Sequence, residues 1–250
     1  MKLLLIRHAD PDNKIDGLTE KGHREAALLA ERLQKEKIVK IYSSPFGRAK
    51  RTAEYTARAL GKTVECKDFL REFHAYFNAS DGGKEVRFPT GRVSHTPWDM
   101  LPADWTQDKR FYDAELWHQV EYYKEAELAA AYAQVAREFD EFLSEYGYRR
   151  ENGYYRVERP NTDTVALFCH FGIETVLLSH LIGVSPVPLW HGFAALPSSV
   201  TTVYTEERRK GIASFRCCGF GDVGHLYAGG ETPSFAARFC EVFDSPDRHD

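Results

Sequence analysis

Two apolar segments of this chain, far apart in the sequence, each end in a histidine. Residues 3–6 lead into Arg7 and His8, and residues 165–169 lead into His170. Short apolar runs of this kind are typical of buried parallel strands. Ligands of open α/β sheets bind beyond the carboxyl ends of the strands, so both histidines are expected to face one crevice. The less specific interpretation is that two buried strands simply stop at histidines.

The residues around both histidines favour an anion as the ligand. Arg7 directly precedes His8, and its guanidinium is a permanent planar cation that matches the geometry of phosphate oxygens. His170 is followed by Gly172 and by an expected helix over residues 173–182, whose N-terminal amides also favour an anion. A phosphate pocket is therefore the leading interpretation.

Composition narrows the class of protein. The chain has 250 residues, 43% of them hydrophobic, which is enough for a folded core, and its net charge of −4 excludes the global basic field that attracts nucleic acid. No apolar run approaches the ~20 residues that span a bilayer, so we expect a cytoplasmic protein with no membrane partner. Five scattered cysteines predict reduced thiols rather than a disulfide framework. A homodimer is left open.

Strand and helix signals alternate, which predicts an α/β fold: a three-layer α/β/α sandwich with a mainly parallel central sheet and an inserted lid-like segment. Thr19 is expected to cap a helix that ends near Leu33. Ser44 and Pro45 predict the start of a second helix, which places Arg48 in its first turn. The expected strands are residues 3–6, 38–42, 64–66 and 165–169, with 200–204 and 212–218 extending the sheet at one edge.

The regular pattern stops between residues 73 and 118. A structureless loop of that length is unusual in a compact domain, so we interpret 73–118 as an insertion with short helices that packs over the site. Residues 1–250 are then one domain. Residues 119–146 have the apolar spacing of a helix with one buried face. Within the insertion, the tryptophans and arginines suggest either a lid that selects the substrate or a small satellite core: Arg87, Arg92, Trp98, Trp105 and Trp117.

Several motifs occur together in one order. They are residues 5–9 (Leu-Ile-Arg-His-Ala), 17–19 (Gly-Leu-Thr), 42–53 (Tyr-Ser-Ser-Pro-Phe-Gly-Arg-Ala-Lys-Arg-Thr-Ala), 168–172 (Phe-Cys-His-Phe-Gly) and 221–226 (Gly-Asp-Val-Gly-His-Leu). In this order and spacing the chain resembles the histidine phosphatase superfamily, in its phosphoglycerate-mutase-like branch (branch 1). It departs from the family at Ala9-Asp10, where the family has Gly-Glu, and at Phe171, where it has a small residue.

Phosphoryl transfer requires that the charge of the phosphate be neutralised before a nucleophile can approach. Arg7, Arg48 and His170 would form that clamp. Spacing alone does not choose between His8 and His170 as the nucleophile; the resemblance implies that His8 attacks and forms a phosphohistidine. It also implies that Glu72 is the general acid, with Asp68 or an insertion residue as alternatives. The Pro-x-x-Arg-Ala match selects Arg48 over its helical neighbour Arg51.

Three functions are consistent with these residues. The first is a phosphatase that hydrolyses a small phosphorylated metabolite, the second a phosphoglycerate mutase, and the third a phosphoester-binding module without turnover. The scheme requires no metal or other cofactor, and the sequence contains neither a His-Glu-x-x-His nor a Cys-x-x-Cys ligand set. Among the remaining histidines, His225 is the strongest further candidate for a functional role.

Overall fold

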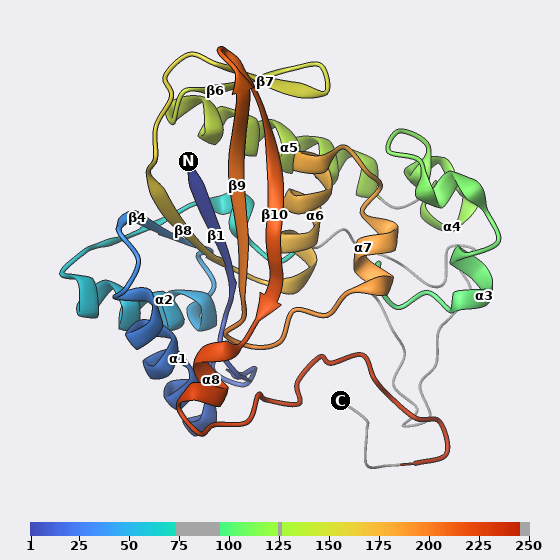
Figure 1. The fold of residues 1–250 in the computed structure, drawn as a ribbon. Helices are drawn as coiled ribbons and strands as arrows, with labels where there is room; N and C mark the ends of the chain where they lie inside the picture. The colour runs from blue at the N-terminus through green and yellow to red at the C-terminus, as the bar shows by residue number, and fades with distance from the viewer. Residues whose placement is uncertain (74–95, 125–126, 246–250) are drawn as a thin grey trace.

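The computed structural model describes residues 1–73, 96–124 and 127–245, and an eight-stranded sheet runs through it (Figure 1). Its strand order is β5-β4-β8-β1-β9-β10-β7-β6. In chain order these strands are β1 (Lys2–Arg7), β4 (Ile38–Ser43), β5 (Val64–Cys66), β6 (Tyr148–Glu151), β7 (Tyr154–Val157), β8 (Thr164–Cys169), β9 (Val200–Arg209) and β10 (Ile212–Asp222). Two further strands, β2 (Pro11–Asp12) and β3 (Gly17–Leu18), pair with each other.

The sheet is parallel in the half that carries both histidine segments. Strand β8 lies between β1 and β4 and is parallel to both, and β4 pairs in parallel with β5. On the other side of β1 every pairing is antiparallel, from β9 through β10 and β7 to β6. The expected parallel sheet is thus confirmed for its core, and the expected strands at 200–204 and 212–218 extend it as a longer antiparallel hairpin.

Side chains alternate along the central strands and divide the core into two. Leu3 and Leu5 of β1 face one cluster, whereas Leu4 and Ile6 face the other, as the two-residue period of a strand requires. Helices α1 and α2 cover the second cluster, and α5 and α6 cover the first, so the three-layer prediction is confirmed. The longer helices are α1 (Glu20–Leu33), α2 (Gly47–Leu60), α5 (Leu128–Glu145), α6 (Phe171–Ile182), α7 (Val187–Gly192) and α8 (Gly224–Ala228).

Three local predictions need correction. The helix expected over 119–146 is divided into α4 (Glu121–Lys124) and α5, and residues 125–126 lie outside the described residues. The hairpin of β6 and β7 was not predicted, because its strands have four residues each and are rich in arginine and tyrosine. Helix α2 begins at Gly47, not at Pro45, and Ser44 is not its N-cap.

Only part of the expected insertion is described, because residues 74–95, with Arg87 and Arg92, lie outside the described residues. Residues 96–118 contain short helices, as predicted, and Trp117 is buried in the larger core cluster, with Trp98 and Trp105 packed against that cluster. These helices are α3 (Pro102–Trp105) and the 3-10 helices η2 (Lys109–Tyr112) and η3 (Trp117–Gln119), whereas η1 (Asp68–Leu70) precedes the insertion.

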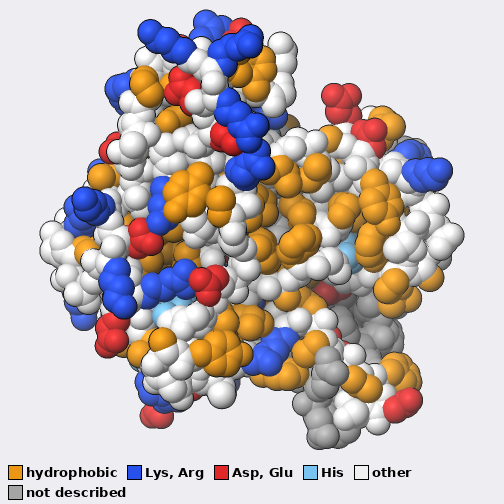
Figure 2. Space-filling model, viewed as in Figure 1, with side chains coloured by type: hydrophobic (Ala, Val, Ile, Leu, Met, Phe, Trp, Pro, Cys, Tyr) orange, Lys and Arg blue, Asp and Glu red, His pale blue; other side chains and the backbone are white. Residues whose placement is uncertain are grey.

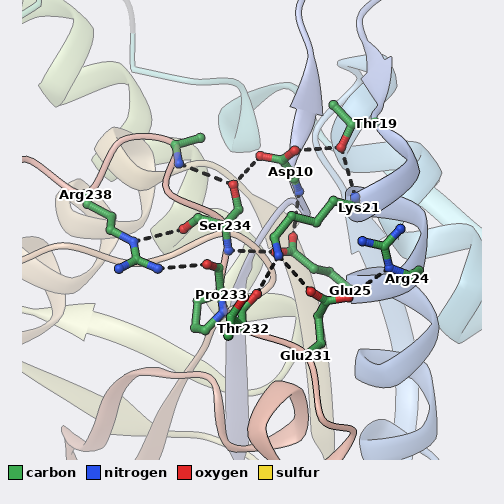
Figure 3. A network of polar contacts seen from close by, with 12 residues as sticks. Asp10, Thr19, Lys21, Arg24, Glu25, Glu231, Thr232, Pro233, Ser234 and Arg238 are labelled. Carbon is green, nitrogen blue, oxygen red and sulfur yellow. Dashed lines mark hydrogen bonds and ion pairs between the residues drawn. The ribbon is translucent and has the colours of Figure 1, made fainter. Parts of the chain in front are cut away.

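After α8, residues 231–239 run back across the molecule, and we call this segment the C-terminal strap. Figure 3 shows that it is fastened to α1 and to the loop after β1. Glu231 pairs with Lys21 and Arg24 of α1, and the hydroxyl of Ser234 donates to Asp10. The strap is therefore tied to the residue that directly follows the His8-Ala9 pair.

Glu25 forms hydrogen bonds with both the C-terminal strap and the loop after β1. Its carboxylate accepts the amide of Asp10 at 2.8 Å and the amide of Ser234 at 3.0 Å (Figure 3). The side chain is buried, and this burial raises the pKa of Glu25 to about 7 against the two hydrogen bonds, which lower it. Because the folded state holds the proton more tightly than the unfolded chain, this group stabilises the fold most at low pH.

The variant Glu25→Gln tests this linkage. Gln cannot ionise, so the stability that wild type loses as the pH rises from about 4.5 to about 7 is not lost in the variant. We expect the variant to be less stable at pH 4.5, because one amide loses its acceptor. The difference in free energy of unfolding should then shrink by up to about 3 kcal/mol by pH 7.5 in urea titrations. Glu31→Gln, an exposed change on α1, should give a constant difference; a constant difference for Glu25→Gln would contradict the linkage.

Candidate active site

The carboxyl ends of the four parallel strands meet at one edge of the sheet. Arg7 is in register with Cys169, and the amide of His8 donates to the Cys169 carbonyl at 3.0 Å. The amide of Ser44, just past β4, donates to the Phe168 carbonyl at 2.8 Å. Both predicted histidines therefore lie beside each other, and their ring centroids are 5.0 Å apart.

The two ring nitrogens of His8 have different partners, and these assign its tautomer. Nδ1 lies 2.8 Å from the carbonyl oxygen of Ala9, which only accepts, so Nδ1 carries the hydrogen. Nε2 accepts from Nε of Arg48 at 3.3 Å. Burial, followed by the charges of Arg7 and Arg48, lowers the pKa of His8 well below its usual value of 6.5. The ring is neutral, with its lone pair on Nε2.

Arg48 is held in place by an aspartate that was not selected from the sequence. Asp16 pairs with Nη1 of Arg48 at 2.8 Å and accepts the amide of Gly47 at 2.5 Å. It thus supplies the cap at the start of α2 for which Ser44 was predicted. A β-carbon at Gly47 would lie 2.1 Å from the Asp16 carbonyl oxygen, so glycine permits this close approach. By contrast Arg51, the alternative to Arg48, is exposed and pairs with Glu54.

The guanidinium of Arg7 is buried close to His8. Its Nη1 donates to the carbonyl of Ala195, in the segment before β9, and to the carbonyl of Ala237 in the C-terminal strap at 3.5 Å. The amide of Arg7 donates to Ser199 at 3.2 Å. The positive charge of Arg7 acts on His8, whose pKa it lowers.

His170 begins α6 and is fully buried. Its Nε2 lies 2.9 Å from Oγ of Ser44, and the ring of Phe46 packs against it at 5.3 Å between centroids. Ser44 therefore contributes to the site as a partner of His170. No sequence signal distinguished this role from that of a helix cap, because both use the same hydroxyl.

Glu72 reaches the first turn of α6. Its Oε1 accepts the amide of Phe73 at 2.8 Å and that of Ile173 at 3.0 Å. Burial raises the pKa of Glu72, against these hydrogen bonds and the charge of Arg7. Asp68, the alternative acid, is exposed and pairs with Arg71, so the structure places Glu72 and not Asp68 against the helix that follows His170.

A second buried carboxyl group, that of Glu174, lies in the same first turn of α6. Burial raises its pKa to about 8, and the neighbouring charge of Glu72 acts in the same direction. Sequence reasoning missed it because a glutamate within an apolar helix carries no local signal. His225 lies elsewhere, with its Nε2 3.1 Å from Ser198 Oγ, and burial lowers its pKa to about 4.

The arrangement can perform one kind of chemistry directly. Two arginines and a buried histidine surround a neutral imidazole nitrogen, and a carboxyl group with a raised pKa lies beside them. Such a set neutralises an anion and presents a nucleophile and a proton donor to it. In the described part of the chain, no three His, Cys, Asp or Glu side chains cluster as metal ligands, and no helix is long and apolar enough to cross a membrane.

Comparison with known families places these features in a wider group. Residues 3–78 match the model of the histidine phosphatase superfamily (branch 1). That segment contains Arg7, His8, Arg48 and Glu72 but ends before His170.

Individual relatives extend the match over most of the chain. Phosphoserine phosphatase 1 of Hydrogenobacter thermophilus is 27% identical over 225 residues, covering 85% of this chain and 90% of the relative. The probable phosphoglycerate mutase GpmB of Photorhabdus laumondii is 35% identical over 83 residues, covering 30% of this chain and 39% of the relative. The crystal structure of a phosphoserine phosphatase mutant from Entamoeba histolytica, in complex with phosphoserine, shares the fold with a TM-score of 0.57 at 19% identity, covering 90% of this chain and 98% of that one.

Proposed function

We propose that this chain, whose residues 3–78 match the model of the histidine phosphatase superfamily (branch 1), is a phosphomonoesterase that hydrolyses a small phosphorylated metabolite through a phosphohistidine on His8. The observation that carries the proposal is the state of His8. Its Nε2 holds a lone pair and accepts from Nε of Arg48 at 3.3 Å, and the charge of Arg7 also acts on the ring, so an approaching phosphate dianion would meet both cations. A module that only bound phosphate would gain more from a charged imidazole than from a neutral one.

In the first step, Nε2 of His8 attacks phosphorus and the bond from phosphorus to the ester oxygen breaks. Arg7, Arg48 and His170 bind the non-bridging oxygens and stabilise the charge of the transition state. Arg48 donates to Nε2 at 3.3 Å, a long contact that it can exchange for a phosphate oxygen. The leaving alkoxide takes the proton of Glu72, whose raised pKa keeps that proton available.

In the second step, a water molecule attacks the phosphohistidine. Glu72, now ionised, accepts a proton from this water; the bond from phosphorus to Nε2 breaks, and the electron pair returns to His8. Inorganic phosphate leaves, and both residues regain their starting states. The hydrogen bond from Nδ1 to Ala9 is kept throughout and orients the ring.

Access of water favours hydrolysis over the mutase reaction, which must exclude water. Glu72 borders a cavity of about 560 Å³, and we call this the polar cavity because Arg71, Gln134 and Glu138 line it beside apolar residues. A cavity of this volume has room for several water molecules beside Glu72. The relatives are named phosphoserine phosphatase and probable phosphoglycerate mutase, so both chemistries occur among similar proteins.

The free cysteines bear on the cellular compartment of the protein. All five cysteines are free in the structure, and Cys169 is buried beside His170, which supports a reducing compartment such as the cytoplasm. The placement of the whole 73–118 insertion over the site, and a homodimer, stay predictions from the sequence.

The variant His8→Ala tests the nucleophile. Without the imidazole there is no acceptor for the phosphoryl group, so turnover of p-nitrophenyl phosphate should fall by about a thousandfold or more. The fold should persist, because His8 follows the end of β1 and belongs to neither hydrophobic core cluster. Far-UV circular dichroism and thermal unfolding check this.

The matched control is His23→Ala, since His23 is exposed on α1 and its ring contacts Tyr55. This variant should retain wild-type turnover. Undiminished activity of a folded His8→Ala protein would refute the assignment of His8 as the nucleophile.

The variant Glu72→Gln tests the proton donor. An alkyl phosphate, with its poor leaving group, needs the proton, whereas p-nitrophenolate leaves without one. We therefore expect ethyl phosphate hydrolysis to slow by about a hundredfold and the burst of p-nitrophenolate in pre-steady-state assays to change only a few fold. Asp68→Asn, a change in the exposed alternative, should affect neither substrate. If Glu72→Gln slowed both substrates equally, the acid would have to be another group.

A further inference from the structure

We propose that an aromatic-walled cavity next to the phosphate clamp is the leaving-group subsite, and that it binds an aromatic ring of the substrate. This proposal rests on the proposed function and specifies the class of ester. The cavity, which we call the aromatic cavity, has a volume of about 550 Å³. Its main apolar walls are Trp98, Met100, Trp105, Trp190, Phe193 and Phe239.

Trp98 connects this cavity to the proposed proton donor. The ring of Trp98 packs on the backbone of Gly172, and a β-carbon placed there would lie 2.2 Å from Trp98 and 2.7 Å from Oε1 of Glu72. The tryptophan ring and the carboxyl oxygen therefore lie beside the same point in the first turn of α6. A leaving oxygen protonated by Glu72 has the wall of the aromatic cavity next to it.

The C-terminal strap connects the cavity to the phosphate clamp from the other side. The strap carbonyl of Ala237 lies 3.5 Å from Nη1 of Arg7, and two residues later Phe239 enters the cavity wall. The ring of Phe171, next to His170, packs against Phe239 at 5.1 Å and against Trp98 at 5.9 Å between centroids. The position at which the chain departs from its family, Phe171, thus supports both walls.

Asp10 is the other position at which the chain departs from the family pattern, and it holds the C-terminal strap that carries Phe239. Its carboxylate accepts from the hydroxyl of Ser234, and the amide of Asp10 shares Glu25 with the amide of Ser234 (Figure 3). This fastening fixes the strap upstream of Phe239. Asp10 and Phe171 therefore both support the wall of the aromatic cavity.

One wall of the aromatic cavity is aromatic and uncharged. Trp105 stacks on His191 with 5.2 Å between centroids and 25° between planes. Nδ1 of His191 lies 2.8 Å from the Val187 carbonyl, which only accepts, and Nε2 accepts the amide of Met100 at 3.2 Å. Burial lowers the pKa of His191, so the ring stays neutral. Rings in offset or edge-to-face contact are the partners that such walls favour.

Charged groups in the lining disfavour an anionic leaving group. Two carboxylates, Asp99 and Glu241, and one guanidinium, Arg238, contribute to the walls. Arg238 donates to the carbonyls of Pro233 and Ser234 within the strap. A leaving group that carried a carboxylate would face this net negative lining.

The surface of the molecule near these elements is hydrophobic. Figure 2 shows hydrophobic side chains gathered over β10, α6 and α7, in keeping with an apolar ligand nearby.

The test compares benzyl phosphate with ethyl phosphate, whose leaving alcohols have similar acidity, so that the ring is the main difference. We expect wild type to have a higher kcat/KM for benzyl phosphate than for ethyl phosphate or 3-phosphoglycerate. Trp105→Ala and Phe239→Ala should each lower the benzyl-to-ethyl ratio by about tenfold. Two variants on separate segments guard against misfolding of one, and circular dichroism checks both.

Matched controls separate this subsite from the rest of the enzyme. Gln134→Ala, in the polar cavity, and Tyr227→Ala, on the surface of α8, should leave the ratio unchanged. A ratio that is unaffected by both Trp105→Ala and Phe239→Ala, or that shifts with Gln134→Ala instead, would overturn the subsite while the phosphatase stands. If wild type hydrolysed none of the three esters faster than His8→Ala does, the proposed function would fail together with the subsite.

Discussion

The neutral state of His8 is the condition on which the chemistry of this site depends. The Ala9 carbonyl holds the hydrogen on Nδ1, while Arg7 and Arg48 raise the free energy of a charged ring, so the lone pair stays on Nε2. In the proposed mechanism, the same two cations attract the phosphate whose phosphorus that lone pair attacks. The two arginines would thereby bind the anion and, together with burial, keep its nucleophile unprotonated. Asp16 pairs with Arg48, and the carbonyls of Ala195 and Ala237 accept from Arg7.

The parallel half of the sheet makes this arrangement possible. Strands β1, β4, β5 and β8 end at one edge, so residues from four distant parts of the chain converge there. In the antiparallel half, β9 pairs with β1, and the segment before β9 supplies a carbonyl for Arg7. The C-terminal strap then brings Phe239 to the crevice, which links the phosphate clamp to a second surface that can recognise the rest of the ester.

Local patterns predicted the parts of this structure that local physics determines. The apolar runs of β1 and β8, the Thr19 cap of α1 and the apolar face of α5 are all confirmed, because each depends on residues close in sequence. The role of Asp16 was not predictable, since it depends on a contact across 31 residues with the amide of Gly47. The same holds for the strap, whose position is set by Glu25 and Asp10, and for Ser44, whose hydroxyl fits two roles equally well.

The protonation state of His8 can be measured directly by nitrogen-15 NMR of the imidazole in the unliganded protein, followed as the pH is lowered. The account predicts a neutral ring with its hydrogen on Nδ1 at pH 6.5, the ordinary pKa of the group, and no titration until well below that pH. A His8 ring that gains its second proton near pH 6.5, or that carries its single hydrogen on Nε2, would contradict the account.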